Sequence, residues 1–295
     1  IMPQMDVVIE VIDARIPYSS ENPMVAALRG EKPVIKILNK ADLADPELTK
    51  AWMEYLEQQD GVKAIACDNN KADDVKRIIA ICKSLVPNKV GTGRQIKAMI
   101  MGIPNVGKST LINTLAGRAV ARTGDEPAVT KSQQLIKLDD DIMLYDTPGM
   151  LWPKVENENS GYRLAATGGI RDTAFDFADV ASYTAEYLMQ AYPELLKTRY
   201  KIEELPKTDW EFFEVAGRNR GCVRAGNQVD TYRMSEILIN ELRSGKLGNI
   251  TLETPEMTEA EEIVVAEQRV AAEEKRIAKE EEKRLRRLKT RKNRK

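Results

Sequence analysis

The chain has 295 residues, 42% of them apolar, and a net charge of −1, which leaves room for two domains and an extension. No run of about 18 apolar residues and no secretory signal is present, so we expect neither a membrane span nor export. Cys67, Cys82 and Cys222 form no CxxC pair, which argues against a disulfide framework or a zinc site and favours the cytoplasm. The complete lack of histidine excludes Ser/His/Asp and Cys/His catalysis.

The first half of the chain predicts an α/β fold. Short runs rich in Val and Ile are typical of buried parallel strands, and they lie at residues 6–13, 33–38, 61–67 and 96–103. Helices are expected between them, near residues 22–29, 46–59 and 72–85, and this βαβ alternation predicts a mostly parallel sheet. Two further strands, at about 134–139 and 141–145, are expected to form a hairpin with a turn at 138–141, so the sheet should be mixed.

The second half predicts a small all-α domain followed by a charged helix. Helical patterning is seen at about 175–190, 208–217 and 230–243. The sequence TEAE, Thr258 to Glu261, has the form of a capping box, and it predicts that a long helix begins there and runs to about residue 290. We expect domain boundaries that give 1–155, 156–255 and 256–295 as three parts of the chain.

The C-terminal segment is strongly basic. Residues 271–295 contain twelve Lys and Arg against five Glu, a net charge of +7, which leaves −8 for the remainder. The last thirteen residues, KRLRRLKTRKNRK, have nine positive charges and no negative one. Such a block indicates either a polyanionic partner or a solvated tail.

The sequence GIPNVGKST, residues 102–110, matches the phosphate-binding pattern GxxxxGK[ST] between a predicted strand and a predicted helix. Gly102 and Gly107 let backbone N–H groups turn toward phosphates, Lys108 can reach the β and γ oxygens, and the Ser109 hydroxyl can bind Mg²⁺. A glycine-rich turn with an incidental lysine is the alternative. We expect nucleotide contacts from Asn105, Val106, Gly107, Lys108, Ser109 and Thr110.

A second phosphate-side motif is DTPG, residues 146–149, at the end of a predicted strand. Asp146 is expected in the Mg²⁺ shell, and the Gly149 N–H can contact a γ-phosphate. Alone, the tetrapeptide could be a β-turn. Thr130, in EPAVTKSQ, lies between the two motifs, where a threonine can close over Mg²⁺; the alternative is an exposed loop threonine. The residues expected to act on the γ-phosphate are Lys108, Thr130 and Gly149.

A guanine-reading motif, NKAD, precedes the phosphate loop by about sixty residues and comprises Asn39, Lys40 and Asp42 at its polar positions. The Asp42 carboxylate can accept from N1–H and the exocyclic amine of guanine, groups that adenine lacks, so the site would reject adenine. Asn39 can bond the opposite edge of the base or brace the phosphate loop. A surface helix start is the alternative for the tetrapeptide. Ala66 and Cys67, in IACD, are expected to pack their backbone against the base.

The order NKAD, GIPNVGKS, PAVT and DTPG resembles the circularly permuted GTPases of the ribosome biogenesis GTPase A family. The resemblance extends from DVVIEVIDARIP to RSGKLGNITLE and includes RNRGCVRAG. It implies a permuted P-loop GTP-binding domain at 1–155, a helical C-terminal domain at 156–255 and a basic tail at 256–295. It also implies GTP and GDP as ligands, Mg²⁺ as cofactor, and a GTP-hydrolysing factor that binds the large ribosomal subunit late in its maturation and is released or reset on hydrolysis.

The resemblance also indicates how hydrolysis would be controlled. Met150 occupies the position where many GTPases have a glutamine that orients water, so we expect slow hydrolysis alone and stimulation by the ribosome. The family has a histidine near its N-terminus that is implicated in catalysis, and we expect an upstream segment to precede Ile1. Asn105 resembles the asparagine that coordinates K⁺ in potassium-activated relatives; a hydrogen-bonded loop asparagine is the alternative.

The partners implied are the large subunit and its rRNA, with no membrane and a monomer off the ribosome. Basic residues that could contact RNA phosphates, or be ordinary solvated charges, are Arg218, Arg220, Arg224, Arg243, Lys246 and the tail. A GTP-switched scaffold for a non-ribosomal partner is the second hypothesis. A P-loop kinase is disfavoured, because NKAD and DTPG together describe a hydrolytic switch.

Overall fold

The computed structural model describes residues 2–68, 71–121, 134–149, 151–152 and 155–292, and the chain divides into two compact units, Ile1–Thr254 and Pro255–Lys295. The expected boundary between residues 155 and 156 lies inside the first unit and stays a prediction. Across the described ranges, no helix has both the length and the apolar character needed to cross a bilayer.

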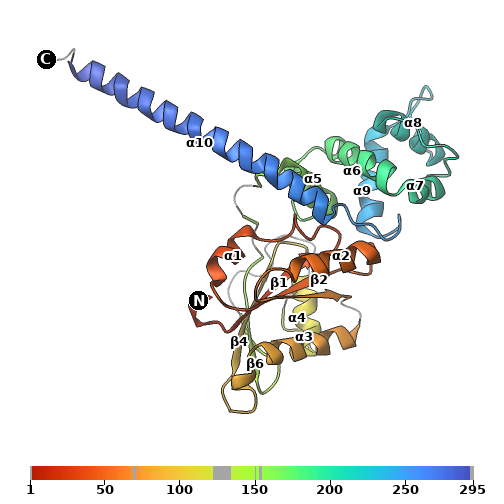
Figure 1. Ribbon diagram of the computed structural model, residues 1–295. Coiled ribbons are helices and arrows are strands. Elements are labelled where there is room, and N and C mark those ends of the chain that lie inside the picture. The colour runs from red at the N-terminus through yellow and green to blue at the C-terminus, as the bar shows by residue number, and fades with distance from the viewer. Residues whose placement is uncertain (1, 69–70, 122–133, 150, 153–154, 293–295) are drawn as a thin grey trace. The chain divides into compact units, whose positions relative to one another are not determined.

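The first unit is built on a six-stranded sheet with the order β3-β2-β1-β4-β6-β5 (Figure 1). The strands are β1 (Val7–Asp13), β2 (Val34–Asn39), β3 (Val62–Cys67), β4 (Ile96–Gly102), β5 (Gln134–Lys137) and β6 (Ile142–Asp146). Every pairing is parallel except that of β5 with β6, which is antiparallel. The mixed, mostly parallel α/β sheet predicted from the sequence is therefore confirmed.

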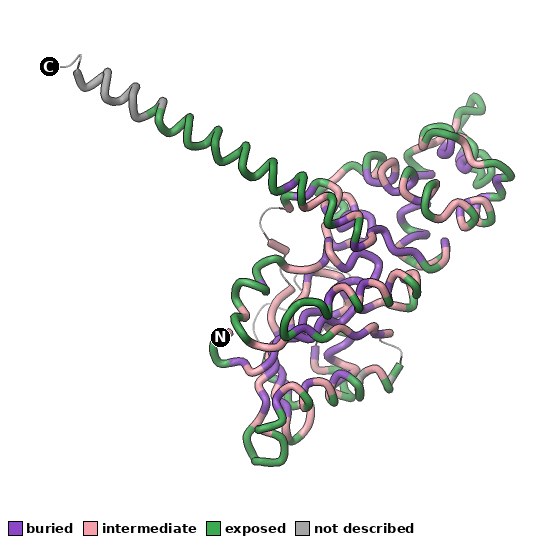
Figure 2. Tube along the Cα trace, in the orientation of Figure 1, coloured by how far each residue is buried: buried purple, intermediate pink, exposed green. Residues whose placement is uncertain are grey.

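Helices cover both faces of the sheet (Figure 1). They are α1 (Pro23–Arg29), α2 (Pro46–Leu56), α3 (Ala72–Leu85) and α4 (Lys108–Ala116). Ile12 and Leu38 pack with Trp52 of α2 on one face, whereas Ile9 and Ile37 share the large core with α3 and α4 on the other. All residues of β1 and β2 are buried, and both strands are purple in Figure 2. Burial on both faces explains why these strands have nearly continuous apolar sequences rather than alternating ones.

The remainder of the first unit is helical and shares the large apolar core with the sheet. Its helices are α5 (Glu158–Thr167), α6 (Phe177–Ala191), α7 (Pro193–Tyr200), α8 (Asp209–Asn219) and α9 (Thr231–Arg243). The sequence predicted α6, α8 and α9 but missed two helices. The buried side of α5 mixes polar Ser160, Arg163 and Thr167 with apolar Leu164, Ala165 and Ala166, so its apolar stripe is interrupted. Helix α7 has only 8 residues.

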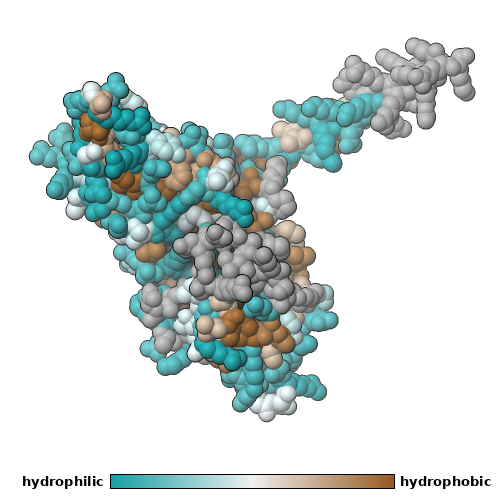
Figure 3. All heavy atoms as spheres, turned by 180° about the vertical axis from the view of Figure 1, so that it is seen from behind, coloured by the Kyte–Doolittle hydropathy of each residue, from teal (hydrophilic) through white to brown (hydrophobic). Residues whose placement is uncertain are grey.

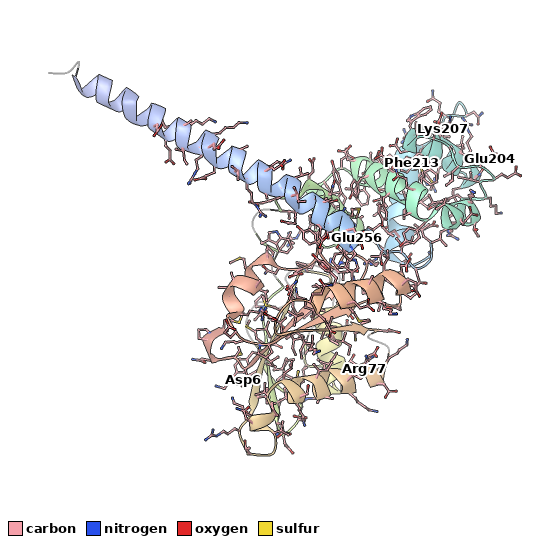
Figure 4. All side chains as sticks on the ribbon, viewed as in Figure 1. Asp6, Arg77, Glu204, Lys207, Phe213 and Glu256 are labelled. Atoms are coloured by element: carbon pink, nitrogen blue, oxygen red, sulfur yellow. The ribbon has the colours of Figure 1, made fainter. Side chains whose placement is uncertain are left out.

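The second unit contains α10 (Pro255–Lys292), and its predicted start was wrong by three residues. Pro255 is the first helical residue and Glu256 is in the first turn (Figure 4). The Thr258 hydroxyl donates to the carbonyl of Pro255 at 3.0 Å, so Thr258 lies inside the helix instead of capping it. Proline suits the first helical position because its φ is preset and its missing N–H would have no helical acceptor. The described surface of α10 is mainly hydrophilic in Figure 3.

A buried charged cluster interrupts the apolar face of β1 and β2. Glu10 and Lys36 are register partners, 1% and 3% exposed, with Lys36 Nζ 3.6 Å from Glu10 Oε2. Lys36 also contacts Glu21, and Glu10 Oε1 accepts the backbone N–H of Asn22 at 2.8 Å. Burial raises the pKa of Glu10 to about 7. The positive charge of Lys36 lowers this pKa, but the negative charge of Glu21 raises it and offsets part of that effect.

This cluster predicts a pH-dependent stability. Glu10 contributes stability that is fully present below its unfolded pKa of about 4.5 and is lost as pH rises through about 7, because the unfolded chain deprotonates first. Glu10→Gln removes this titration, so the stability of the variant relative to wild type should rise by about 2 to 3 kcal/mol between pH 5 and pH 8. Urea unfolding at both pH values measures it.

The matched control is Glu54→Gln, because Glu54 is exposed on α2 and faces Lys50. Its stability difference from wild type should be the same at both pH values. A pH-independent difference for Glu10→Gln as well would contradict the prediction.

Candidate functional site

The polar residues of the predicted site meet at one edge of the sheet. The parallel strands end there in Asp13 (β1), Asn39 (β2), Cys67 (β3), Gly102 (β4) and Asp146 (β6). The carboxyl ends of parallel strands are where ligands bind in α/β sheets. The guanine-reading and phosphate-binding motifs, distant in sequence, therefore end at the same edge.

The phosphate loop connects β4 to α4. Asn105 and Gly107 have positive φ values of 60° and 89°, and Gly107 caps the N-terminus of α4. A Cβ at Gly102 would lie 2.6 Å from the carbonyl oxygen of Val11, so only glycine fits against β1. Ser109 and Thr110 lie in the first turn of α4, where free N–H groups and the helix dipole favour a phosphate.

Lys108 and Asp146 form a buried ion pair, with Lys108 6% exposed and Asp146 fully buried. Oδ2 of Asp146 has no hydrogen-bond partner in the part of the chain that the structure describes. That part also contains no cluster of three or more acidic, His or Cys side chains suited to a metal. Mg²⁺ at nucleotide sites uses one or two carboxylates with phosphates and water, so this donor set fits Mg²⁺.

Gly149 lies beside the phosphate loop. A Cβ at Gly149 would be 3.5 Å from the carbonyl oxygen of Gly102 and 3.5 Å from the nitrogen of Pro104. The DTPG segment is thus in contact with the loop that the sequence assigned to phosphates. Thr130 and Met150 lie outside the described residues.

The NKAD segment is tied to the phosphate loop. Asn39 Nδ2 donates to the carbonyl of Val106 at 2.6 Å, so its amide braces that loop. The backbone N–H of Ala41 donates to the carbonyl of Cys67 at 3.2 Å, which brings the IACD strand end, Ala66 included, beside NKAD. Asp42 is exposed at the edge. Burial raises the pKa of Cys67 to about 12, so this residue remains a thiol.

A charged triad of Asp13, Arg15 and Lys40, not predicted from the sequence, holds the NKAD segment. Asp13 accepts from Arg15 at 2.9 and 2.8 Å and from Lys40 Nζ at 3.0 Å. Arg15 is 1% exposed and Lys40 has a positive φ of 59°. Burial acts against the charged form, but the Arg15 and Lys40 cations hold the pKa of Asp13 well below its usual value. The sequence feature that could have indicated this triad is an aspartate, Asp13, at the end of a buried strand with Arg15 two residues later.

The phosphate loop also contacts the helical region. Asn105 Nδ2 donates to the carbonyl of Gly168, the C-cap of α5, at 2.9 Å. A Cβ at Gly169 would lie 3.1 Å from Ile103 Cδ1 and 3.0 Å from Leu164 Cδ2, so this turn packs closely on the loop. Of the two interpretations of Asn105, the structure displays the hydrogen bond, made through the amide nitrogen.

The basic residues proposed for RNA differ in their availability. Arg243 donates to the carbonyls of Ala165 and Ala166 and pairs with Asp172, so its guanidinium serves the fold. Arg220 pairs with Glu241 at 2.7 Å. Three other side chains are more open. Arg218 is 48% exposed and pairs with Glu214 at 3.3 Å, Arg224 is 66% exposed and pairs with Asp230 at 2.7 Å, and Lys246 is exposed. The tail side chains from residue 284 onward lie outside the described residues.

The charged triad predicts a large cost for removing its carboxylate. Asp13→Asn leaves the buried Arg15 without an anionic partner, and we expect a loss of about 3 to 5 kcal/mol in the free energy of unfolding. Urea denaturation followed by circular dichroism measures it. Asp140→Asn, which breaks an exposed pair with Lys137, is the control and should leave stability unchanged. A loss for Asp13→Asn below about 1 kcal/mol, as for a surface pair, would refute the buried role.

The chain is similar to several known proteins. Residues 97–210 match the family model described as 50S ribosome-binding GTPase. The chain is 48% identical over 259 residues to ribosome biogenesis GTPase A of Bacillus cereus, covering 85% of this chain and 87% of that protein.

Two solved structures of the Thermotoga maritima protein YlqF are similar. The GDP-bound one has a TM-score of 0.63 at 27% identity and covers 86% of this chain and 97% of its own. The GNP-bound one has a TM-score of 0.60 at 27% identity, with 86% and 95% covered. The circular permutation inferred from motif order matches this fold. The chain belongs to the ribosome biogenesis GTPase A family and is a GTP-binding, GTP-hydrolysing factor of ribosome assembly.

Proposed function

We propose that this GTPase binds the large ribosomal subunit late in its maturation, in the cytoplasm, and is released or reset when GTP is hydrolysed. The observation that carries the GTP-dependent part of the proposal is the meeting of NKAD and the phosphate loop at one sheet edge, joined by the Asn39 to Val106 hydrogen bond. The match to a 50S ribosome-binding GTPase model supports the choice of subunit. Off the ribosome the protein acts as a monomer.

In this proposal Asp42 recognises guanine through N1–H and the 2-amine, with Lys40 and the Ala66–Cys67 backbone beside the base. The exposed position of Asp42 at the sheet edge suits this role. Because a carboxylate accepts two hydrogen bonds from guanine and none from adenine at these positions, selectivity arises from groups left unpaired in the wrong complex.

Exchange of the Asp42 carboxylate for an amide should change which base is preferred. Xanthine has a carbonyl in place of the 2-amine, so the amide of Asp42→Asn can donate to it. We expect GTP affinity to fall about 100-fold and xanthosine triphosphate to become the better ligand. Competition binding measures both, with the exposed Asp60→Asn as control. Unchanged guanine preference in Asp42→Asn would remove Asp42 from base recognition.

The phosphate end is assigned to α4 and the switch residues. Backbone N–H groups of Val106 to Thr110 and the Lys108 ammonium would hold the β and γ phosphates, and the Gly149 N–H would contact the γ-phosphate. Ser109, Thr130 and Asp146 would hold Mg²⁺, which supplies positive charge as the γ-phosphate leaves. Lys108 would then exchange its Asp146 partner for phosphate. K⁺ is assigned to the Asn105 side-chain oxygen, since its nitrogen bonds Gly168.

Loss of the γ-phosphate can reach the helical region by two short routes. The DTPG segment leads along the chain into α5, and Asn105 bonds the C-cap of the same helix. We therefore assign the response to hydrolysis to a shift of α5 relative to the phosphate loop. The outer helical surface would transmit it to rRNA.

The helical region has exposed aromatic side chains as well as basic ones. Trp210 of α8 and Tyr232 of α9 are 64% and 48% exposed, and neither was singled out from the sequence. With Arg218, Arg224 and Lys246 they offer phosphate contacts and stacking faces suited to RNA.

The proposal predicts stimulation by one ribosomal subunit. GTP hydrolysis in K⁺ buffer should rise at least about tenfold with purified large subunits and remain unchanged with small ones. The double variant Arg218→Glu, Lys246→Glu should be stimulated less by the subunit but should hydrolyse GTP at the wild-type rate without it. The control Lys50→Glu, on the exposed face of α2, should be stimulated as strongly as wild type. Replacing K⁺ by Na⁺ in the same assay tests whether hydrolysis depends on the K⁺ assigned to Asn105. Normal GTP binding with no stimulation by either subunit would favour a scaffold for a non-ribosomal partner.

A further inference from the structure

The segment Asn249–Glu253, here called the C-terminal strap, lies along the loop that contains Asp42. The side chain of Asn249 donates through Nδ2 to the carbonyls of Asp42 (2.8 Å) and Ala44 (3.0 Å). The N–H of Ile250 donates to the carbonyl of Leu43 (3.0 Å), and the N–H of Asp45 donates to Thr251 Oγ1 (3.1 Å). The N–H of Leu252 donates to the carbonyl of Arg15, just after β1, at 2.8 Å. The strap and the Asp42 loop, which are 205 to 207 positions apart in the sequence, are therefore hydrogen-bonded to each other.

The strap itself is firmly held. Thr251 and Glu253 are fully buried. The hydroxyl of Tyr187 donates to the carbonyl of Thr251 at 3.0 Å, and the indole of Trp52 donates to the carbonyl of Glu253 at 3.0 Å. The Glu253 carboxylate accepts from the backbone of Ser19 at 3.0 Å. Because these anchors lie outside the Asp42 loop, the strap can serve as a fixed reference for it.

The Asp42 loop needs such a reference. It begins at Lys40 with a positive φ, and Asp42 lies exposed on it. The carbonyls of Asp42 and Ala44 both point to one amide, that of Asn249, which fixes the backbone on either side of Leu43. A loop held in its binding conformation before the ligand arrives binds more tightly, since less ordering remains to be done.

We infer that Asn249 is a positioning residue for guanine recognition, holding the backbone that orients the Asp42 carboxylate. The inference deepens the proposed function and rests on the role of Asp42 assigned there. It adds a residue beyond the GTPase motifs, supplied by the segment after α9. The simpler reading is that Asn249 only joins two parts of the fold. That reading predicts equal weakening for every nucleotide, in step with lost stability.

GDP and inosine diphosphate separate the two readings, because inosine lacks the 2-amine and makes one fewer bond to Asp42. The test compares Asn249→Asp and Asn249→Ala with wild type, by calorimetric titration of each nucleotide into the full chain. We expect the Kd for GDP to rise about tenfold and that for inosine diphosphate about threefold or less, so discrimination falls. Asn240→Asp, which places the same change at an exposed position on α9, should leave both values unchanged.

Two controls make the result decisive. Unfolding without nucleotide reports any structural loss, and an unchanged ratio of the two Kd values in both Asn249 variants would overturn the inference whatever their stability. Asp42→Asn is titrated alongside. If that variant also keeps the wild-type ratio, the role proposed for Asp42 fails; if it alone loses discrimination, only the role of Asn249 fails.

Discussion

The site depends on the ion pairs that the buried carboxylate of Asp13 forms with Arg15 and Lys40. Asp13 ends the central strand β1, and the two cations that it holds belong to different segments of the edge. Lys40 has a backbone conformation that favours glycine, and its ion pair with Asp13 helps to offset that strain. Arg15 extends the same network to the carbonyl of Arg243 at the end of α9. One carboxylate thus links the sheet, the guanine-reading loop and the helical region.

Permutation of the motif order leaves this edge intact and alters the route by which the chain leaves it. Each motif still ends a parallel strand or comes directly after one, so the phosphate and guanine loops converge whichever comes first along the chain. The connection after DTPG is different, because it leads to α5 instead of returning to another strand. The helical region then contacts both loops, through Gly168 on the phosphate side and the C-terminal strap on the guanine side. The phosphate loop and the NKAD loop are therefore each hydrogen-bonded to the helical region.

The sequence predicted the sheet and the motifs because both are local patterns. Apolar runs identified the strands, and glycine spacing identified the phosphate loop. It missed α5, whose buried face mixes polar and apolar residues, the 8-residue α7, and the start of α10 at Pro255. It could not reveal that Arg243 serves the fold, or that Asn249 contacts the Asp42 loop, because those partners lie 71 to 78 and 205 to 207 positions away. Residue type alone does not specify a partner at such separations.

Two loops distant in sequence are expected to form one guanine nucleotide site. A crystal structure of the full chain with GDP and Mg²⁺ would test this expectation. We expect the Asp42 carboxylate within hydrogen-bond distance of guanine N1, the Lys108 ammonium on the β-phosphate instead of Asp146, and Mg²⁺ beside Ser109. A base bound away from Asp42, or a Lys108 to Asp146 ion pair that persists beside the bound phosphates, would contradict it.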